Sequence, residues 1–131
     1  KTVIIADDML ASGGTMLIAM KTLRNMGAKK IICITSLPFF NGGAVETFDK
    51  AHGEGVFDYV IGTNAVYHGD DLLSKQWFIQ TDTSELFARV ISRLHHGRAI
   101  SPLLDNRKIV QKLVDNSQNA AVKKQGDVSK N

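Results

Sequence analysis

The stretch Val3-Ile4-Ile5-Ala6-Asp7-Asp8-Met9-Leu10-Ala11-Ser12-Gly13-Gly14-Thr15 decides how the fold of this chain is read. Its apolar run Val3–Ala6 ends in two acids and predicts a buried β-strand. The turn Ser12–Thr15 follows, and apolar residues then recur at helical spacing as far as Gly27, which predicts a helix with a glycine stop. Ligands of open α/β sheets bind at the carboxyl ends of strands, so this junction is the first candidate for a binding site.

The rest of the chain continues the alternation of strands and helices. Composition and spacing predict further strands at Lys30–Thr35, Tyr59–Ile61 and Trp77–Gln80. They predict helices over Ala44–Ala51, from Asp82–Glu85 to Leu94, and over Asn106–Val114. Loops are expected at 37–43 and 67–75, and a break at Ser101-Pro102. This order indicates an α/β fold with a mostly parallel sheet and helices on both faces. Four strands are few for such a sheet and the chain opens directly in a strand, so we expect a longer protein with a further N-terminal portion.

The composition sets limits on the class of protein. A chain of 131 residues suits one domain, and a net charge of +3 does not argue for a nucleic-acid surface. The single cysteine, Cys33, lies in an apolar run and predicts a buried, inert thiol, which fits a reducing cytoplasm. No apolar run approaches the ~20 residues that cross a bilayer, so we expect no membrane contact. From residue 116 onward the composition turns polar and predicts a flexible tail over 116–131.

The turn after the first strand has the parts of a sugar-phosphate site. Gly13 and Gly14 allow the backbone N–H groups to approach a phosphate, and the helix that follows adds its positive end. Ser12 and Thr15 add hydroxyl donors. Asp7 and Asp8 supply acceptors suited to a ribose diol, and they could also reach Mg²⁺ through water.

The complete pattern, an apolar strand, Asp-Asp, two apolar residues, a spacer and Ser-Gly-Gly-Thr, resembles the phosphoribosyl-binding signature of type I phosphoribosyltransferases and ribose-phosphate pyrophosphokinases. Three later blocks are similar to the pyrophosphokinases in particular: Leu37–Glu46, Val60–Asn64 and the closing segment Leu94–Leu104, which carries His95-His96-Gly97-Arg98-Ala99-Ile100-Ser101. The resemblance runs from Lys1 to Leu104. The chain is thus identified as a C-terminal portion of a ribose-phosphate pyrophosphokinase.

The resemblance implies a type I phosphoribosyltransferase-like domain over residues 1–115, part of a longer two-domain enzyme. It implies transfer of the diphosphoryl group of ATP to ribose 5-phosphate, giving phosphoribosyl pyrophosphate and AMP, with Mg²⁺ as cofactor. Asp7 and Asp8 would hold the ribose hydroxyls, and Ser12, Gly13, Gly14 and Thr15 the 5-phosphate. The catalytic residues and those for ATP and metal are expected upstream of Lys1, so we expect no protein metal site here and no turnover by this chain alone. The family also implies homo-oligomers, from dimers to hexamers.

Two departures from the family pattern keep alternatives open. Many members have an acid where this chain has Ala11, and Thr-His where it has Thr35-Ser36. One alternative is a transferase that uses phosphoribosyl pyrophosphate to modify a nucleobase, and another is a non-catalytic subunit that regulates an active synthetase. A phospho-acceptor receiver domain is disfavoured, since Asp58 precedes its strand instead of ending it.

Other conspicuous residues receive structural interpretations. Adjacent histidines on a helix point in different directions, so His95 and His96 are expected to end a helix and not to share a metal. Trp77 and Phe78 are expected in the core, as are the methionines Met16, Met20 and Met26.

Overall fold

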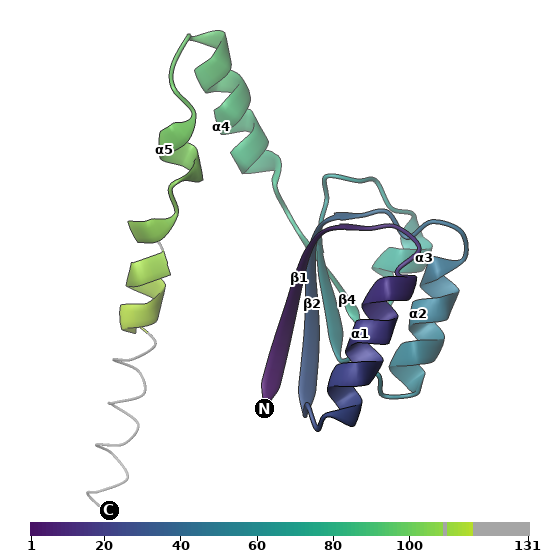
Figure 1. Cartoon of the computed structure of the whole chain (residues 1–131). Coiled ribbons are helices and arrows are strands. Elements are labelled where there is room, and N and C mark those ends of the chain that lie inside the picture. Colours follow the sequence, from purple (N-terminus) through teal and green to yellow (C-terminus); the bar gives the residue numbers. More distant parts are fainter. Residues whose placement is uncertain (109, 117–131) are drawn as a thin grey trace, which may run out of the picture. The chain divides into compact units, whose positions relative to one another are not determined.

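A computed structural model describes residues 1–108 and 110–116 of the chain, and it divides into two compact units, Lys1–Ser84 and a second that begins at Glu85. The first unit holds a parallel four-stranded sheet in the order β1-β2-β3-β4, connected by helices (Figure 1). The strands are β1 (Thr2–Leu10), β2 (Lys30–Pro38), β3 (Tyr59–Thr63) and β4 (Phe78–Thr81), and the helices are α1 (Gly14–Asn25), α2 (Ala44–Gly53), α3 (Asp70–Leu73), α4 (Ser84–His95) and α5 (Ser101–Leu104). The predicted α/β fold with a parallel sheet is confirmed.

The first two strands are longer than the sequence predicted. β1 pairs with β2 from Thr2↔Lys30 to Leu10↔Pro38, so the strand continues through the two acids instead of ending at them. Backbone pairing uses N–H and C=O groups that every residue except proline has, and the change to polar side chains therefore does not stop it. The connection between β1 and α1 shrinks as a result to Ala11–Gly13.

One face of the sheet carries the core of the first unit. Ile31, Cys33 and Val60 are fully buried, and α1 and α2 lie on the same side of the sheet (Figure 1). On the other face, Ile4 is 62% and Ile79 is 42% exposed. The described helices of this unit thus cover one face, and successive strand residues alternate between core and surface.

Aromatic side chains form the part of the core nearest α2. The cluster contains Phe40, Phe48, Phe57, Trp77 and Phe78, all buried. The indole Nε1 of Trp77 donates to Asp49 Oδ1 at 2.9 Å, which satisfies its polar group. The core positions predicted for Trp77 and Phe78 are confirmed.

The methionines of α1 do not all share one environment. Met16 and Met20 are buried as predicted, but Met26 is 78% exposed. The prediction for Met26 was wrong because the residue occupies the C-cap of α1, past the last residue of the helix.

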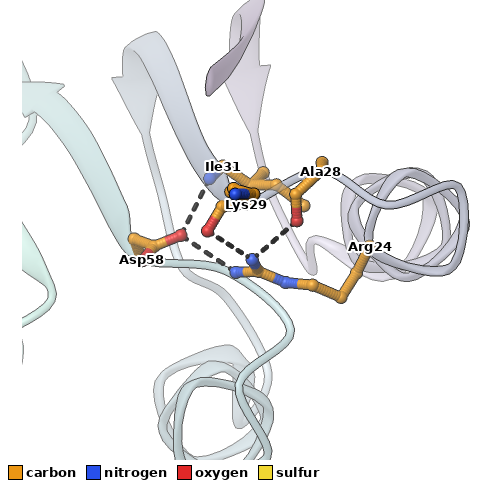
Figure 2. A network of polar contacts seen from close by, with 5 residues as sticks. All are labelled: Arg24, Ala28, Lys29, Ile31 and Asp58. Carbon is orange, nitrogen blue, oxygen red and sulfur yellow. Dashed lines mark hydrogen bonds and ion pairs between the residues drawn. The ribbon is translucent and has the colours of Figure 1, made fainter. Parts of the chain in front are cut away.

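The amino ends of the strands are held by a polar clamp, made of Arg24, Asp58 and the backbone between them (Figure 2). Nη1 of Arg24 donates to the carbonyl oxygens of Ala28 and Lys29, each at 2.9 Å. Nη2 donates to Asp58 Oδ2 at 2.9 Å, and this same oxygen accepts the backbone N–H of Ile31 at 2.8 Å. One side chain from α1 therefore ties the starts of β2 and β3 together.

The later segments differ from prediction in two places. The stretch 67–75, predicted as a loop, contains the short helix α3, whose Leu72 is buried. Ser101-Pro102 opens α5 instead of breaking the chain, since proline is tolerated in the first turn, where its missing N–H is not needed.

The beginning and end of α4 agree with prediction. Asp82 Oδ1 accepts the N–H of Ser84 at 2.9 Å, and the helix ends at His95. In the second unit, 107–108 and 110–116 are helical, in line with the predicted last helix.

Two predictions remain untested by the described residues. That residues 1–115 act as one domain stays a prediction, and the predicted tail 116–131 lies, except for residue 116, outside the described part of the chain. Within residues 1–108 and 110–116, no helix has the length and apolar character needed to span a membrane.

Candidate functional site

The candidate site is a hollow of about 320 Å³ where β1 passes into α1. It is lined by Asp7 and by every residue from Met9 to Met16. The hollow thus lies at the carboxyl end of a parallel strand, where α/β sheets receive their ligands.

The floor of the hollow is the amino-terminal end of α1. Gly13 is the N-cap with φ 73°, a left-handed conformation that favours glycine, and no side chain of the described residues caps the helix. The first N–H groups of a helix have no partner within it, and the peptide dipoles add a partial positive charge there. The exposed end of α1 is therefore suited to an anion.

Gly13 and Gly14 contribute in different ways. A Cβ at Gly13 would lie 2.2 Å from Cε2 of Phe48, so only glycine fits over this ring. A Cβ at Gly14 would meet nothing within 4 Å. Gly13 is thus required by the protein's own packing, whereas Gly14 faces open space.

The predicted side chains gather at this hollow with one exception. Ser12 and Thr15 are exposed, and their hydroxyl groups have no hydrogen-bond partner among the described residues. Asp7 lines the hollow and its Oδ1 accepts the N–H of Asp8 at 2.9 Å. Asp8 itself is exposed but does not line the hollow. Asp7, Ser12, Gly13, Gly14 and Thr15 are therefore brought together, and Asp8 lies beside them.

Two buried titratable groups do not line the hollow. Burial, and secondarily the nearby Asp7 carboxylate, raises the pKa of Cys33 to about 12, which agrees with the predicted inert thiol. Burial lowers the pKa of His68, whose ring lies 6.4 Å from that of Phe40. Burial thus disfavours the charged form of both groups.

The sequence interpretation missed the residues that support the loop from behind. Phe39, Phe40 and Asn41 donate backbone hydrogen bonds to the end of β1, and the ring of Phe48 lies beneath Gly13. The stretch 37–43 reads only as a loop. Its one local signal is the glycine pair Gly42-Gly43, which marks a turn but does not say what the turn contacts.

The chemistry that this hollow offers is binding. Among the described residues that line it, Asp7 is the single ionisable one, and none is a lysine, histidine or cysteine. Free amides and hydroxyls on one side suit a phosphate, and a carboxylate on the other suits hydroxyl groups. No cluster of three metal-binding side chains occurs in the described part of the chain.

Comparison with known proteins identifies the family. Residues 1–68 match the phosphoribosyl transferase domain. The chain is 34% identical over 116 residues to the ribose-phosphate pyrophosphokinase of Chlorobaculum tepidum, covering 88% of this chain and 34% of that protein. It is 38% identical over 106 residues to ribose-phosphate pyrophosphokinase 2 of Schizosaccharomyces pombe, covering 79% and 31%.

A solved structure agrees with these relatives. The phosphoribosylpyrophosphate synthetase of Mycobacterium smegmatis superposes with a TM-score of 0.66 at 27% identity, covering 74% of this chain and 31% of that one. The chain spans about a third of the length of the relatives that it matches. No side chain of the described residues caps α1, and packing against Phe48 requires a glycine at position 13. The family match covers more than half of the chain. The chain therefore belongs to the phosphoribosyl transferase domain family, and its similarity to ribose-phosphate pyrophosphokinases is confirmed.

Proposed function

We propose that this chain supplies the ribose 5-phosphate site of a ribose-phosphate diphosphokinase. The observation that carries the proposal is the uncapped end of α1, which faces a hollow edged by the Asp7 carboxylate. Ser12, Gly13, Gly14 and Thr15 bind the 5-phosphate through amides and hydroxyls. Asp7 and Asp8 accept hydrogen bonds from the ribose hydroxyls.

The proposed reaction transfers the diphosphoryl group of ATP to the C1 hydroxyl of ribose 5-phosphate. Its products are phosphoribosyl pyrophosphate and AMP. The residues of this chain act by fixing the acceptor sugar at two points, the phosphate and the diol, so that the C1 hydroxyl has a defined position. Since the relatives are about three times as long, we place the ATP site and the groups that act on the transferred phosphorus atoms in the rest of the intact protein.

The hollow supplies only some of the oxygen ligands that a bound Mg²⁺ needs. Mg²⁺ prefers oxygen ligands and keeps several waters, and Asp7 presents carboxylate oxygens at the hollow. Asp7 and Asp8 would hold it through water, with substrate oxygens completing the set. When bound, Mg²⁺ neutralises charge on the diphosphoryl group. We also propose that the protein is cytoplasmic, in line with the reducing environment that Cys33 suggests. By its similarity to the pyrophosphokinases, we propose that it forms homo-oligomers.

Calorimetric titration of the intact protein with ribose 5-phosphate tests the proposal. Thr15→Val removes a hydroxyl donor to the phosphate, and Asp7→Asn removes a charged acceptor for the diol. A hydrogen bond to a charged group contributes about 1.5–3 kcal/mol, so each variant should weaken binding roughly tenfold or more.

Matched controls exist on the same unit. Thr22 lies on α1 away from the hollow, with its Oγ1 donating to Ile18 O at 2.9 Å, and Asp70 is exposed in the first turn of α3. Thr22→Val and Asp70→Asn should leave the dissociation constant unchanged. Equal affinity in Thr15→Val, Asp7→Asn and the wild type would remove the basis of the assignment. Tighter binding of a nucleobase than of ribose 5-phosphate would favour a transferase instead.

A further inference from the structure

The segment Phe39–Asn41, which follows β2, is hydrogen-bonded to the last residue of β1 and to the first residue of the phosphate-binding turn. The N–H groups of Phe39 and Phe40 both donate to Leu10 O, at 2.8 and 3.2 Å. The N–H of Asn41 donates to Ala11 O at 3.0 Å. The contacts continue the β1–β2 pairing beyond its last register pair, Leu10↔Pro38.

These hydrogen bonds orient the peptide planes of the turn. A trans peptide is planar, and its N–H points opposite to its C=O. Holding Ala11 O toward Asn41 therefore turns the N–H of Ser12 away from the segment, and Ser12 lines the hollow. No described residue accepts a hydrogen bond from Ser12, so its N–H is available to a ligand.

Phe40 fixes the segment at the cost of backbone strain. Its φ is 49°, the one positive value at a non-glycine residue in the described part of the chain. This backbone conformation is strained for a bulky residue, and the surrounding structure must offset the strain. The offset comes from its buried ring, which packs 5.2 Å from Phe48, 5.8 Å from Trp77 and 5.8 Å from Phe78.

The aromatic contacts lead back to the same turn. The ring of Phe48 packs edge-on against Phe40, and its Cε2 and Cζ occupy the space where a Cβ of Gly13 would lie. The turn is thus supported twice from the Phe40 side, at Leu10 and Ala11 by backbone hydrogen bonds and at Gly13 by the Phe48 ring.

We infer that Phe40 is a positioning residue for the phosphate-binding turn. Its ring holds the segment Phe39–Asn41 in place, and the segment aims the amide of Ser12 into the hollow. The inference rests on the proposed function for the identity of the ligand. It does not make Phe40 a ligand-binding residue, because Phe40 does not line the hollow.

The test compares Phe40→Leu with Phe57→Leu in the intact protein. Phe57 is a matched control, since it is 2% exposed and packs on the same cluster, 5.6 Å from Phe48 and 5.6 Å from Trp77, but precedes β3 at the other end of the sheet. Both variants lose a similar amount of buried ring. A purely structural role for both residues predicts equal losses of stability and unchanged affinity at a temperature where both are folded.

Two measurements separate the roles. Calorimetry should show a dissociation constant for ribose 5-phosphate that rises about tenfold in Phe40→Leu and stays within about twofold in Phe57→Leu. Amide hydrogen exchange by NMR should show faster exchange at Asn41 in Phe40→Leu alone. Equal changes in both variants, or a protected Asn41 amide in Phe40→Leu, would overturn the inference.

The exchange measurement also separates this inference from the proposed function. If the wild-type protein does not bind ribose 5-phosphate, the proposed function fails. Exchange at Asn41 then still decides whether Phe40 fixes the segment: faster exchange in Phe40→Leu alone supports the coupling, and no difference between the variants rejects it.

Discussion

At the amino ends of β2 and β3, the guanidinium of Arg24 and the carboxylate of Asp58 share four hydrogen bonds with each other and with the backbone (Figure 2). At the carboxyl end of β1, by contrast, the hydroxyls of Ser12 and Thr15 have no partner among the described residues, and the end of α1 carries no cap. Most polar groups of the clamp are thus paired within the protein, whereas the hydroxyls beside the start of α1 are left available. Polar groups satisfied within the protein add stability, whereas groups left open to solvent can be satisfied by a ligand.

The largest expected effect is at Gly13, where the open end depends on tight packing. Gly13→Ala combines a left-handed φ with a Cβ 2.2 Å from the Phe48 ring, and overpacking of this kind typically costs 1–3 kcal/mol on top of about 1 kcal/mol for the backbone. Urea unfolding should show a loss of roughly 2–4 kcal/mol. Gly14→Ala is the control, since its Cβ meets nothing, and should change stability by less than about 1 kcal/mol. Similar stability of the two variants would mean that Phe48 does not restrict the turn.

A smaller loss is expected when the closed end is opened. Arg24→Met removes the donors that Arg24 supplies to the Asp58 carboxylate and to two carbonyl oxygens, at a cost of about 1–3 kcal/mol in the free energy of unfolding. The affinity for ribose 5-phosphate should not change, because the clamp lies at the amino ends of the strands and the hollow at the carboxyl end of β1. Arg89→Met, which breaks the exposed pair with Glu85, should cost under about 0.5 kcal/mol. A weakened affinity in folded Arg24→Met would contradict the separation of the two ends.

Lowering the pH should also weaken the clamp, because it protonates Asp58. Burial acts to raise the pKa of Asp58, but the Ile31 N–H and the Arg24 guanidinium outweigh it, so the pKa lies below its ordinary value. The contribution of Asp58 is therefore complete above the unfolded-state pKa of about 3.9 and is lost as the pH falls through the lower folded-state value.

The smallest effect is expected at His68, whose buried ring packs against Phe40 and Phe78. Burial lowers the pKa of His68, so the unfolded chain binds a proton more readily than the folded one. Its contribution to stability is present above the unfolded-state pKa of about 6.5 and declines as the pH falls below it. His68→Phe should flatten the pH dependence of the unfolding free energy below about pH 6.5. An unchanged slope would show that His68 titrates as in the unfolded chain.

Much of the architecture follows from local pattern. The apolar run at Val3–Ala6, the Ser-Gly-Gly-Thr turn and the helical spacing after it are local signals, and they predict β1, the turn and α1. The apolar, β-branched run around Cys33 predicts its burial, and Cys33 is fully buried.

The parts that sequence reasoning missed depend on contacts distant along the chain. Arg24 and Asp58 are 34 residues apart, and nothing local to either predicts the clamp. The positive φ of Phe40 is set by its aromatic neighbours and runs against its own preference. The extension of β1 through Asp7 and Asp8 requires β2 beside it, so a strand end chosen by polarity falls too early.

Because β1 reaches Leu10 and α1 begins at Gly14, the turn that would grip a phosphate has only three residues of its own, Ala11–Gly13. Fixing the backbone of one residue costs about 1–2 kcal/mol in conformational entropy. In this turn the backbone is already fixed when the protein folds, so ligand binding does not have to order it. Such a turn is preorganised, so it has little conformational freedom to close around a ligand or to adapt to a larger one. Lengthening it by a single residue would shift the helix start relative to Asp7, and the distance between phosphate and diol contacts would change with it.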